Sequence, residues 1–69
     1  MNEEYIILFA KYLKNELSYE LRRTFEYRLI NDIKVSENLK ASDLIPENQF
    51  VKLYRAIKEK IEYELQHAS

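Results

Sequence analysis

Apolar residues recur along this chain at the three- and four-residue spacing of amphipathic helices. In residues 3–17 this spacing places one apolar set on a single helix face: Ile6, Phe9, Ala10, Leu13 and Leu17. Asn2 is suited to the N-cap position, and Glu3 and Glu4 suit the positive end of a helix dipole. The pattern therefore predicts a first helix from about Glu3 to Leu17.

A second apolar stripe has a period of four residues and follows directly: Leu21, Phe25, Leu29 and Ile33. Ser18 can cap the helix that carries it, which we expect to run to about Lys34. The first and second stripes lie at different angles, so we expect the chain to break within residues 15–18 and to form a helical hairpin. One bent helix is the alternative.

The third apolar face is the longest, and it comprises Phe50, Leu53, Tyr54, Ile57, Ile61 and Leu65. Pro46 suits the first turn of a helix, so we expect a helix from Pro46 to about His67. We interpret residues 35–45 as a connector containing at most one helical turn, which Ser36 would cap. The sequence thus predicts an all-α, compact three-helix domain over residues 1–69, made of the hairpin and a longer C-terminal helix.

Glycine and cysteine are both absent from the 69 residues. Without glycine, left-handed backbone positions must fall to Asn or Asp, and glycine-rich phosphate loops and nucleophile elbows are excluded. Without cysteine there is no disulfide or thiolate. The single histidine, His67, is close to the C-terminal end. We therefore predict no enzyme activity, no catalytic residues, no metal site and no cofactor.

The charges nearly balance, with 11 basic and 12 acidic residues and a net charge of −1. A strongly basic balance would have favoured nucleic acid as a partner, and it is absent. The apolar run at residues 5–10 is too short to span a membrane, and the acids before it are unlike the start of a signal peptide. We expect a cytoplasmic protein with no membrane partner.

The first predicted helix carries more apolar residues than one buried face requires. Beside its core face lie Tyr5, Leu8 and Tyr12, at positions i, i+3 and i+7. Either this helix is central in the bundle, or its second face is left for a partner. A 69-residue chain has little material to cover both faces, so we predict that these three residues contact a protein partner or a second copy in a homodimer.

An alternative surface lies on the second predicted helix, where the chain is most basic. Arg22, Arg23, Tyr27 and Arg28 combine arginine with tyrosine, which suits phosphate groups as well as acidic protein partners. Three arginines are few, however, and acidic residues lie among them. Contact with nucleic acid or an acidic partner is therefore the second hypothesis for this chain.

The basic residues of the third predicted helix do not form a recognition stripe. Three of the four stand four residues before an acid: Arg55 before Glu59, Lys58 before Glu62, and Lys60 before Glu64. Such pairs neutralise the local charge, and phosphate affinity depends on unpaired basic contacts. We interpret this outer surface as the solvated face of a packing helix.

No motif in the chain is specific enough to identify a family. The sequence favours a small, non-enzymatic regulatory protein that binds and modulates a larger protein, or self-associates, through the tyrosine-rich face of its first helix. A regulator or inhibitor of a cellular machine would fit, as would an accessory protein of a phage or plasmid. The alternative is a small DNA- or RNA-binding transcriptional regulator that uses the arginine-rich second helix, or a helix-turn-helix-like unit formed by Leu39, Ala41, Leu44 and Ile45 with the helix that follows.

Overall fold

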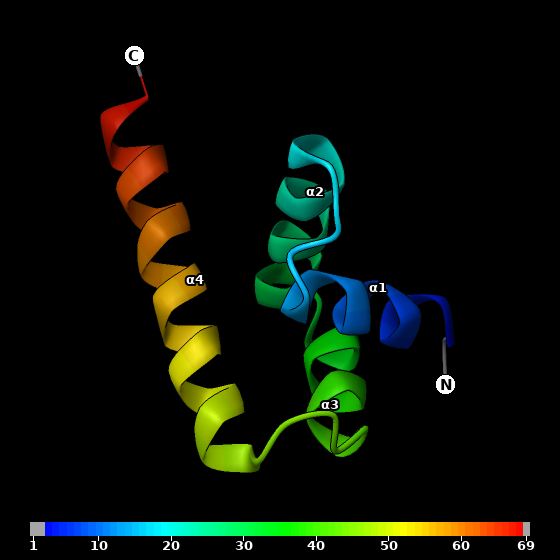
Figure 1. Ribbon diagram of the computed structural model, residues 1–69. Coiled ribbons are helices and arrows are strands. Elements are labelled where there is room, and N and C mark those ends of the chain that lie inside the picture. The colour runs from blue at the N-terminus through cyan, green and yellow to red at the C-terminus, as the bar shows by residue number, and fades with distance from the viewer. Residues whose placement is uncertain (1–2, 69) are drawn as a thin grey trace.

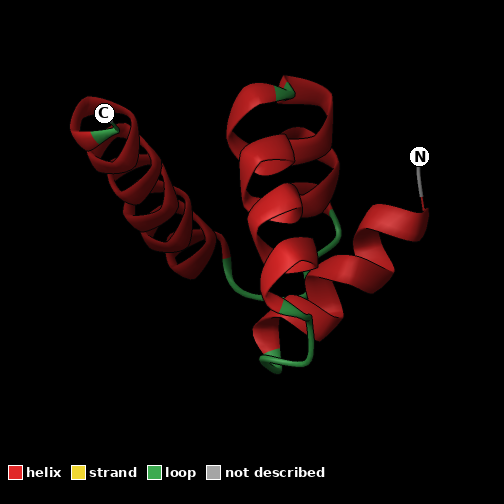
Figure 2. Cartoon of the chain, turned by 90° about the horizontal axis from the view of Figure 1, so that it is seen from above, coloured by secondary structure: helices red, strands yellow, loops and turns green. Residues whose placement is uncertain are grey.

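A computed structural model describes residues 3–68, and these residues form four helices and no strand. The helices are α1 (Glu3–Leu13), α2 (Tyr19–Asn31), α3 (Ile33–Ala41) and α4 (Glu47–His67). Figures 1 and 2 show α2 and α3 in the middle, with α1 on one side and α4 on the other. The all-α prediction is confirmed, and the prediction of three helices is wrong because residues 33–41 form a helix of their own.

Asp32 explains why the second predicted helix is divided. Its extended backbone (φ −119°, ψ 104°) ends α2, while its own N–H still donates to the Arg28 carbonyl. Its carboxylate then accepts from the Lys34 N–H at 3.0 Å and caps α3. The predicted cap of this region, Ser36, instead donates its hydroxyl to the Ile33 carbonyl. One aspartate thus serves two helix ends, and the expected connector becomes α3.

The predicted break between the first two helices is present, but α1 ends at Leu13, four residues earlier than expected. Asn15 has a left-handed backbone (φ 59°), and Ser18 caps α2 by accepting from the Leu21 N–H. Figure 1 shows α1 lying across the junction of α2 and α3 and not alongside α2. The proposed Asn2 cap lies outside the described residues.

The turn before α4 uses the second left-handed residue, Asp43 (φ 58°). As expected for a chain without glycine, both left-handed positions among residues 3–68 fall to Asn or Asp. Pro46 stands one residue outside α4, as its N-cap, and α4 ends at His67 as predicted.

The core is formed by aromatic and aliphatic residues from all four helices. Phe9, Phe25, Leu29 and Leu39 are almost completely buried, and each contributes about 1.5–3 kcal/mol through burial. The Phe9 ring stacks on Phe25 at 5.9 Å and meets Phe50 edge-on at 6.1 Å. This cluster holds α1 and the start of α4 against the middle pair of helices.

Four residues that the apolar stripes placed in the core are exposed: Leu13, Leu21, Ile33 and Leu65. Leu13 and Ile33 lie at helix ends created by the breaks described above. Leu65 lies near the end of α4, and Figure 1 shows this end rising past the top of α2. The stripes were correct near the middle of each helix and failed towards its ends.

Candidate functional site

The first predicted site, Tyr5, Leu8 and Tyr12, is half-buried and packs against the core. Two large apolar residues of the same helix are exposed: Ile7, at 57% exposure, and Leu13 at its end, at 39%. The structure therefore places these three residues together on α1, but much of their surface is already covered by the chain itself.

Tyr12 takes part in a buried polar contact that sequence reasoning missed. Its hydroxyl donates to the Glu26 carboxylate at 2.7 Å, and Lys60 Nζ lies 2.6 and 2.7 Å from the two Glu26 oxygens. Glu26 is only 3% exposed. These three side chains join α1, α2 and α4, so the contact fixes how α4 lies against the rest of the fold.

Burial has a clear effect on the ionisation of Tyr12. Desolvation is the largest cause that raises the pKa of the Tyr12 phenol, followed by the hydrogen bond to Glu26 and by the Glu26 charge. The charge of Arg22 opposes this shift. The phenol therefore stays protonated at neutral pH and donates to Glu26.

The second predicted site is only partly assembled. Arg23, Tyr27 and Arg28 line one shallow hollow on α2, and Arg22 does not line it. Arg23 forms an ion pair with Glu64, and its guanidinium lies 5.6 Å from the Tyr27 ring centre. Within residues 3–68, Arg28 is thus the one arginine of this hollow without an ion pair. One unpaired cation gives little affinity for a phosphate backbone.

A second feature is the groove between α3 and α4, which has a volume of about 460 Å³. It exists because α4 packs mainly against α2, while α3 and α4 diverge (Figure 1). Nine residues line it: Ile33, Ser36, Glu37, Lys40, Phe50, Val51, Tyr54, Arg55 and Lys58. We call this feature the α3/α4 groove.

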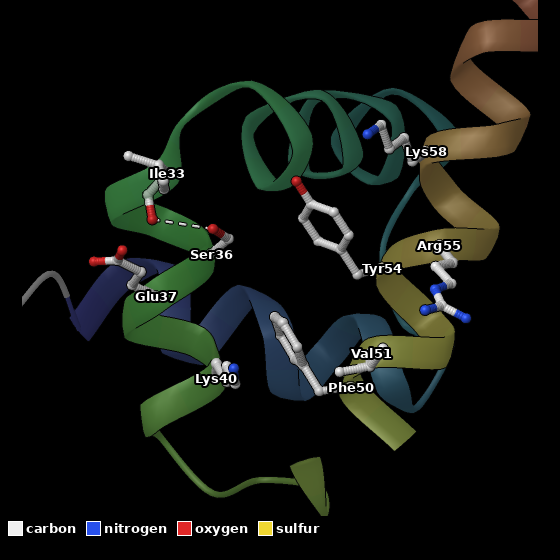
Figure 3. A pocket seen from close by; sticks show the side chains of 9 residues that line it. All are labelled: Ile33, Ser36, Glu37, Lys40, Phe50, Val51, Tyr54, Arg55 and Lys58. Carbon is white, nitrogen blue, oxygen red and sulfur yellow. Dashed lines mark hydrogen bonds between the residues drawn. The ribbon is translucent and has the colours of Figure 1, made fainter. Parts of the chain in front are cut away.

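The floor of the groove is apolar and aromatic. Figure 3 shows Phe50 and Tyr54 projecting from α4 into the space between the two helices. Their rings stack with a centre-to-centre distance of 6.4 Å, and Phe50 is 5% exposed. Val51 and Ile33 add exposed aliphatic surface, at 38% and 71% exposure. Aromatic surface bordered by polar groups is typical of recognition sites.

The rim of the groove is predominantly basic. Lys40, Arg55 and Lys58 line it, and Glu37 is its single acid. Lys40 is paired with Glu47 at 2.9 Å, whereas neither Arg55 nor Lys58 belongs to an ion pair of the described residues. The rim therefore presents unpaired positive charge beside an apolar floor.

The predicted neutralisation of α4 by pairs within the helix is wrong. Across residues 3–68, the ion pairs join different elements: Arg23 with Glu64, Lys40 with Glu47, and Lys60 with Glu26. Lys60 and Glu64 thus bind α2 instead of each other. Arg55 and Lys58 also form no ion pair with Glu59 or Glu62 among the described residues. Because the sequence analysis assumed that they were neutralised, it missed the basic rim of the groove.

Neither a metal-binding cluster nor a membrane-spanning helix is present among the described residues. Among residues 3–68 there is no cluster of three or more His, Asp or Glu side chains placed to hold a metal. His67 stacks on Tyr63 at the end of α4, with Nδ1 2.8 Å from the Tyr63 carbonyl oxygen. In the same range, no helix is both long and apolar enough to cross a membrane.

Comparison with known proteins adds no family: no protein-family model, no curated protein and no solved structure matches this chain.

Proposed function

We propose that this chain is a small, non-enzymatic interaction protein that binds a protein helix in the α3/α4 groove and regulates its target by doing so. The observation that carries the proposal is the aromatic floor of Phe50 and Tyr54 beside the unpaired cations Arg55 and Lys58. Tyrosine and arginine are among the residue types enriched at protein interfaces.

A helix is the form of partner that suits this surface. The described residues contain no strand, so there is no sheet edge to which an extended peptide could add. The groove runs beside two helices, along residues 33–40 and 50–58. Each stretch is about two helical turns long. An amphipathic helix places its apolar side chains in such a groove at i, i+3 or i+4, and i+7 spacing.

The tyrosine-rich face of α1 remains the competing surface for the same function. Tyr5, Leu8 and Tyr12 are half-buried, so less of their area is free to be covered by a partner. A charge at Leu8 would disturb the core as well as any interface, because Leu8 packs against buried residues. Ile7, which is exposed on the same helix, is the better position for testing that surface.

The test is selection from a displayed library of amphipathic helices against three forms of the protein: wild type, Val51→Asp and Ile7→Asp. Both positions are exposed, so neither change is expected to disrupt folding, which circular dichroism checks. We expect helices recovered on wild type to bind Ile7→Asp equally and to lose at least about tenfold in affinity for Val51→Asp. Equal binding to Val51→Asp would contradict the proposal, and loss on Ile7→Asp alone would transfer the site to α1.

Nucleic-acid binding is the second proposal. One observation favours it, namely that Arg23, Tyr27 and Arg28 line a common hollow. It ranks lower because Glu64 already neutralises Arg23. Its distinguishing property would be an affinity that falls steeply as salt concentration rises.

A further inference from the structure

One face of α4 continues beyond the groove and carries a repeating pattern. Val51, Arg55, Lys58, Glu62 and Leu65 follow each other at spacings of four, three, four and three residues. This spacing places all five on one side of the helix, as in the seam of a coiled coil. All five are exposed, and three of them, Val51, Arg55 and Lys58, line the α3/α4 groove.

The two halves of this face carry opposite charges. The internal ion pairs direct Lys60 and Glu64 towards α2. Arg55 and Lys58 are exposed on the N-terminal half of the face, and Glu62 is exposed on its C-terminal half, with Glu59 exposed beside the face. Neither half is neutralised by an ion pair within residues 3–68. The acidic half is therefore complementary in charge to the basic rim of the groove.

The same face is also apolar at both ends. Val51 is 38% exposed at one end, and Leu65 is 63% exposed at the other. Leu65 lies near the end of α4, and this end rises past the top of α2 (Figure 1). A helix with apolar ends and opposite charges between them is complementary to itself when a copy runs antiparallel. Two-fold dimers require this kind of self-complementarity.

We infer that the occupant of the α3/α4 groove is the C-terminal half of α4 from a second copy of this chain, so that two α4 helices pair antiparallel about a two-fold axis. This inference rests on the proposed function, since it names the helix that the groove receives. In this pairing Val51 meets Leu65 of the second copy, and Arg55 meets Glu62 of the second copy.

Both contacts point to the same axis. The midpoints of the pairs Val51–Leu65 and Arg55–Glu62 fall on the same helical turn, at Lys58 and Glu59. Near the axis, Lys58 of each copy lies close to Glu59 of the other. Each acidic half of α4 thereby enters the other copy's basic groove, so the dimer covers both grooves and both exposed Leu65 side chains.

Dimerisation would also add buried surface to a chain that buries little by itself. A domain of this size buries only about 60% of the surface that its unfolded chain exposes. Small domains without disulfides or metals often gain stability by association. Of the large apolar residues that are exposed, Ile33, Val51 and Leu65 lie in the groove or on the pairing face. Antiparallel pairing would bury them.

The test uses charge reversal, read by sedimentation equilibrium over a range of protein concentrations. Arg55→Glu places two acids together in the homodimer, and Glu62→Arg places two bases together. We expect each single variant to raise the dimer dissociation constant at least about tenfold. The control is Lys52→Glu, which makes the same charge change as Arg55→Glu on a different side of α4 and should leave the dimer unchanged.

Two further samples test the antiparallel register itself. In an equal mixture of Arg55→Glu and Glu62→Arg chains, both contacts regain opposite charges, so we expect heterodimers with an affinity near that of wild type. The double variant carrying both changes in one chain should likewise regain its homodimer. A general loss of helix stability could not produce either recovery, and circular dichroism of each single variant checks the fold.

The outcomes separate this inference from the proposed function. A wild-type chain that stays monomeric at millimolar concentration, or charge variants that do not recover on mixing, would overturn the inference. If the dimer tests failed but library helices bound wild type and lost affinity for Val51→Asp, the proposed function would be retained, with an acidic helix of another protein as the partner. If neither dimers nor helices with Val51-dependent binding were found, the dimer inference and the proposed function would both be refuted.

Discussion

The loss of folding stability should differ between the two partners of the contact between Glu26 and Lys60, depending on which one is removed. Glu26 is 3% exposed, whereas the Lys60 side chain is 44% exposed. Lys60→Met leaves a buried carboxylate with Tyr12 as its remaining side-chain donor. Glu26→Gln leaves an ammonium group that can turn to water, and an amide oxygen that still accepts from Tyr12. We therefore predict that Lys60→Met is the more damaging change.

The magnitudes follow from burial. Removing one partner of a fully buried ion pair costs about 3–5 kcal/mol. Because Tyr12 still donates and the Lys60 side of the contact is open to water, we expect Lys60→Met to cost about 2–3 kcal/mol. Glu26→Gln should cost about 1 kcal/mol, the typical net value of one hydrogen bond. A domain of this length has a free energy of unfolding of about 3–10 kcal/mol, so the first loss is large.

The assay is urea denaturation at neutral pH, followed by far-ultraviolet circular dichroism. Lys60→Met should also lower the melting temperature by about 10–20 °C. Lys52→Met is the matched control, since Lys52 is exposed on the same helix without an ion pair among the described residues. If Lys60→Met cost no more than Lys52→Met or Glu26→Gln, the role assigned to the buried contact would be refuted.

Two further predictions concern pH and packing. Because burial raises the pKa of Tyr12 above its ordinary value of 10.0, the stability that the protonated phenol contributes is complete below pH 10 and is lost as the pH rises towards the folded-state pKa. Tyr12→Phe should remove this part of the alkaline loss of stability in denaturation curves measured at successive pH values. An unchanged alkaline loss in Tyr12→Phe would contradict this prediction. Leu29→Ala should cost about 2–5 kcal/mol, whereas Leu21→Ala, at a position 52% exposed, should cost less than about 1 kcal/mol; equal costs would contradict the burial described here.

The sequence was a good guide to the middle of each helix and to the break before α2, but not to the break at Asp32. Phe9, Phe25 and Ile57 lie in the core, as their spacing predicted. Ser18 was identified as a cap because a serine hydroxyl just before an apolar stripe can accept from a backbone N–H of the first helical turn. Asp32 was missed because Ile33 continued the stripe of α2, and the period of four concealed a helix end.

The candidate site was harder to predict, because it depends on distances between helices. Lys60 precedes Glu64 by four residues, and nothing local indicates that both instead bind α2. Arg55 and Lys58 also form no ion pair with the acids four residues after them, within the described residues. Likewise, the α3/α4 groove exists because α4 packs mainly on α2, which periodicity along one helix does not reveal. Helix faces follow from sequence, whereas grooves follow from tertiary packing.

The most direct test is whether the α3/α4 groove becomes covered when two copies of the chain associate. The chain contains no cysteine, so Val51→Cys and Ile7→Cys each introduce a single thiol whose alkylation rate can be measured from micromolar to millimolar protein. Both positions are exposed. We predict that Val51→Cys reacts several-fold more slowly at high concentration while Ile7→Cys does not change. A constant rate at Val51→Cys, together with protection of Ile7→Cys, would contradict the account and place the binding surface on α1.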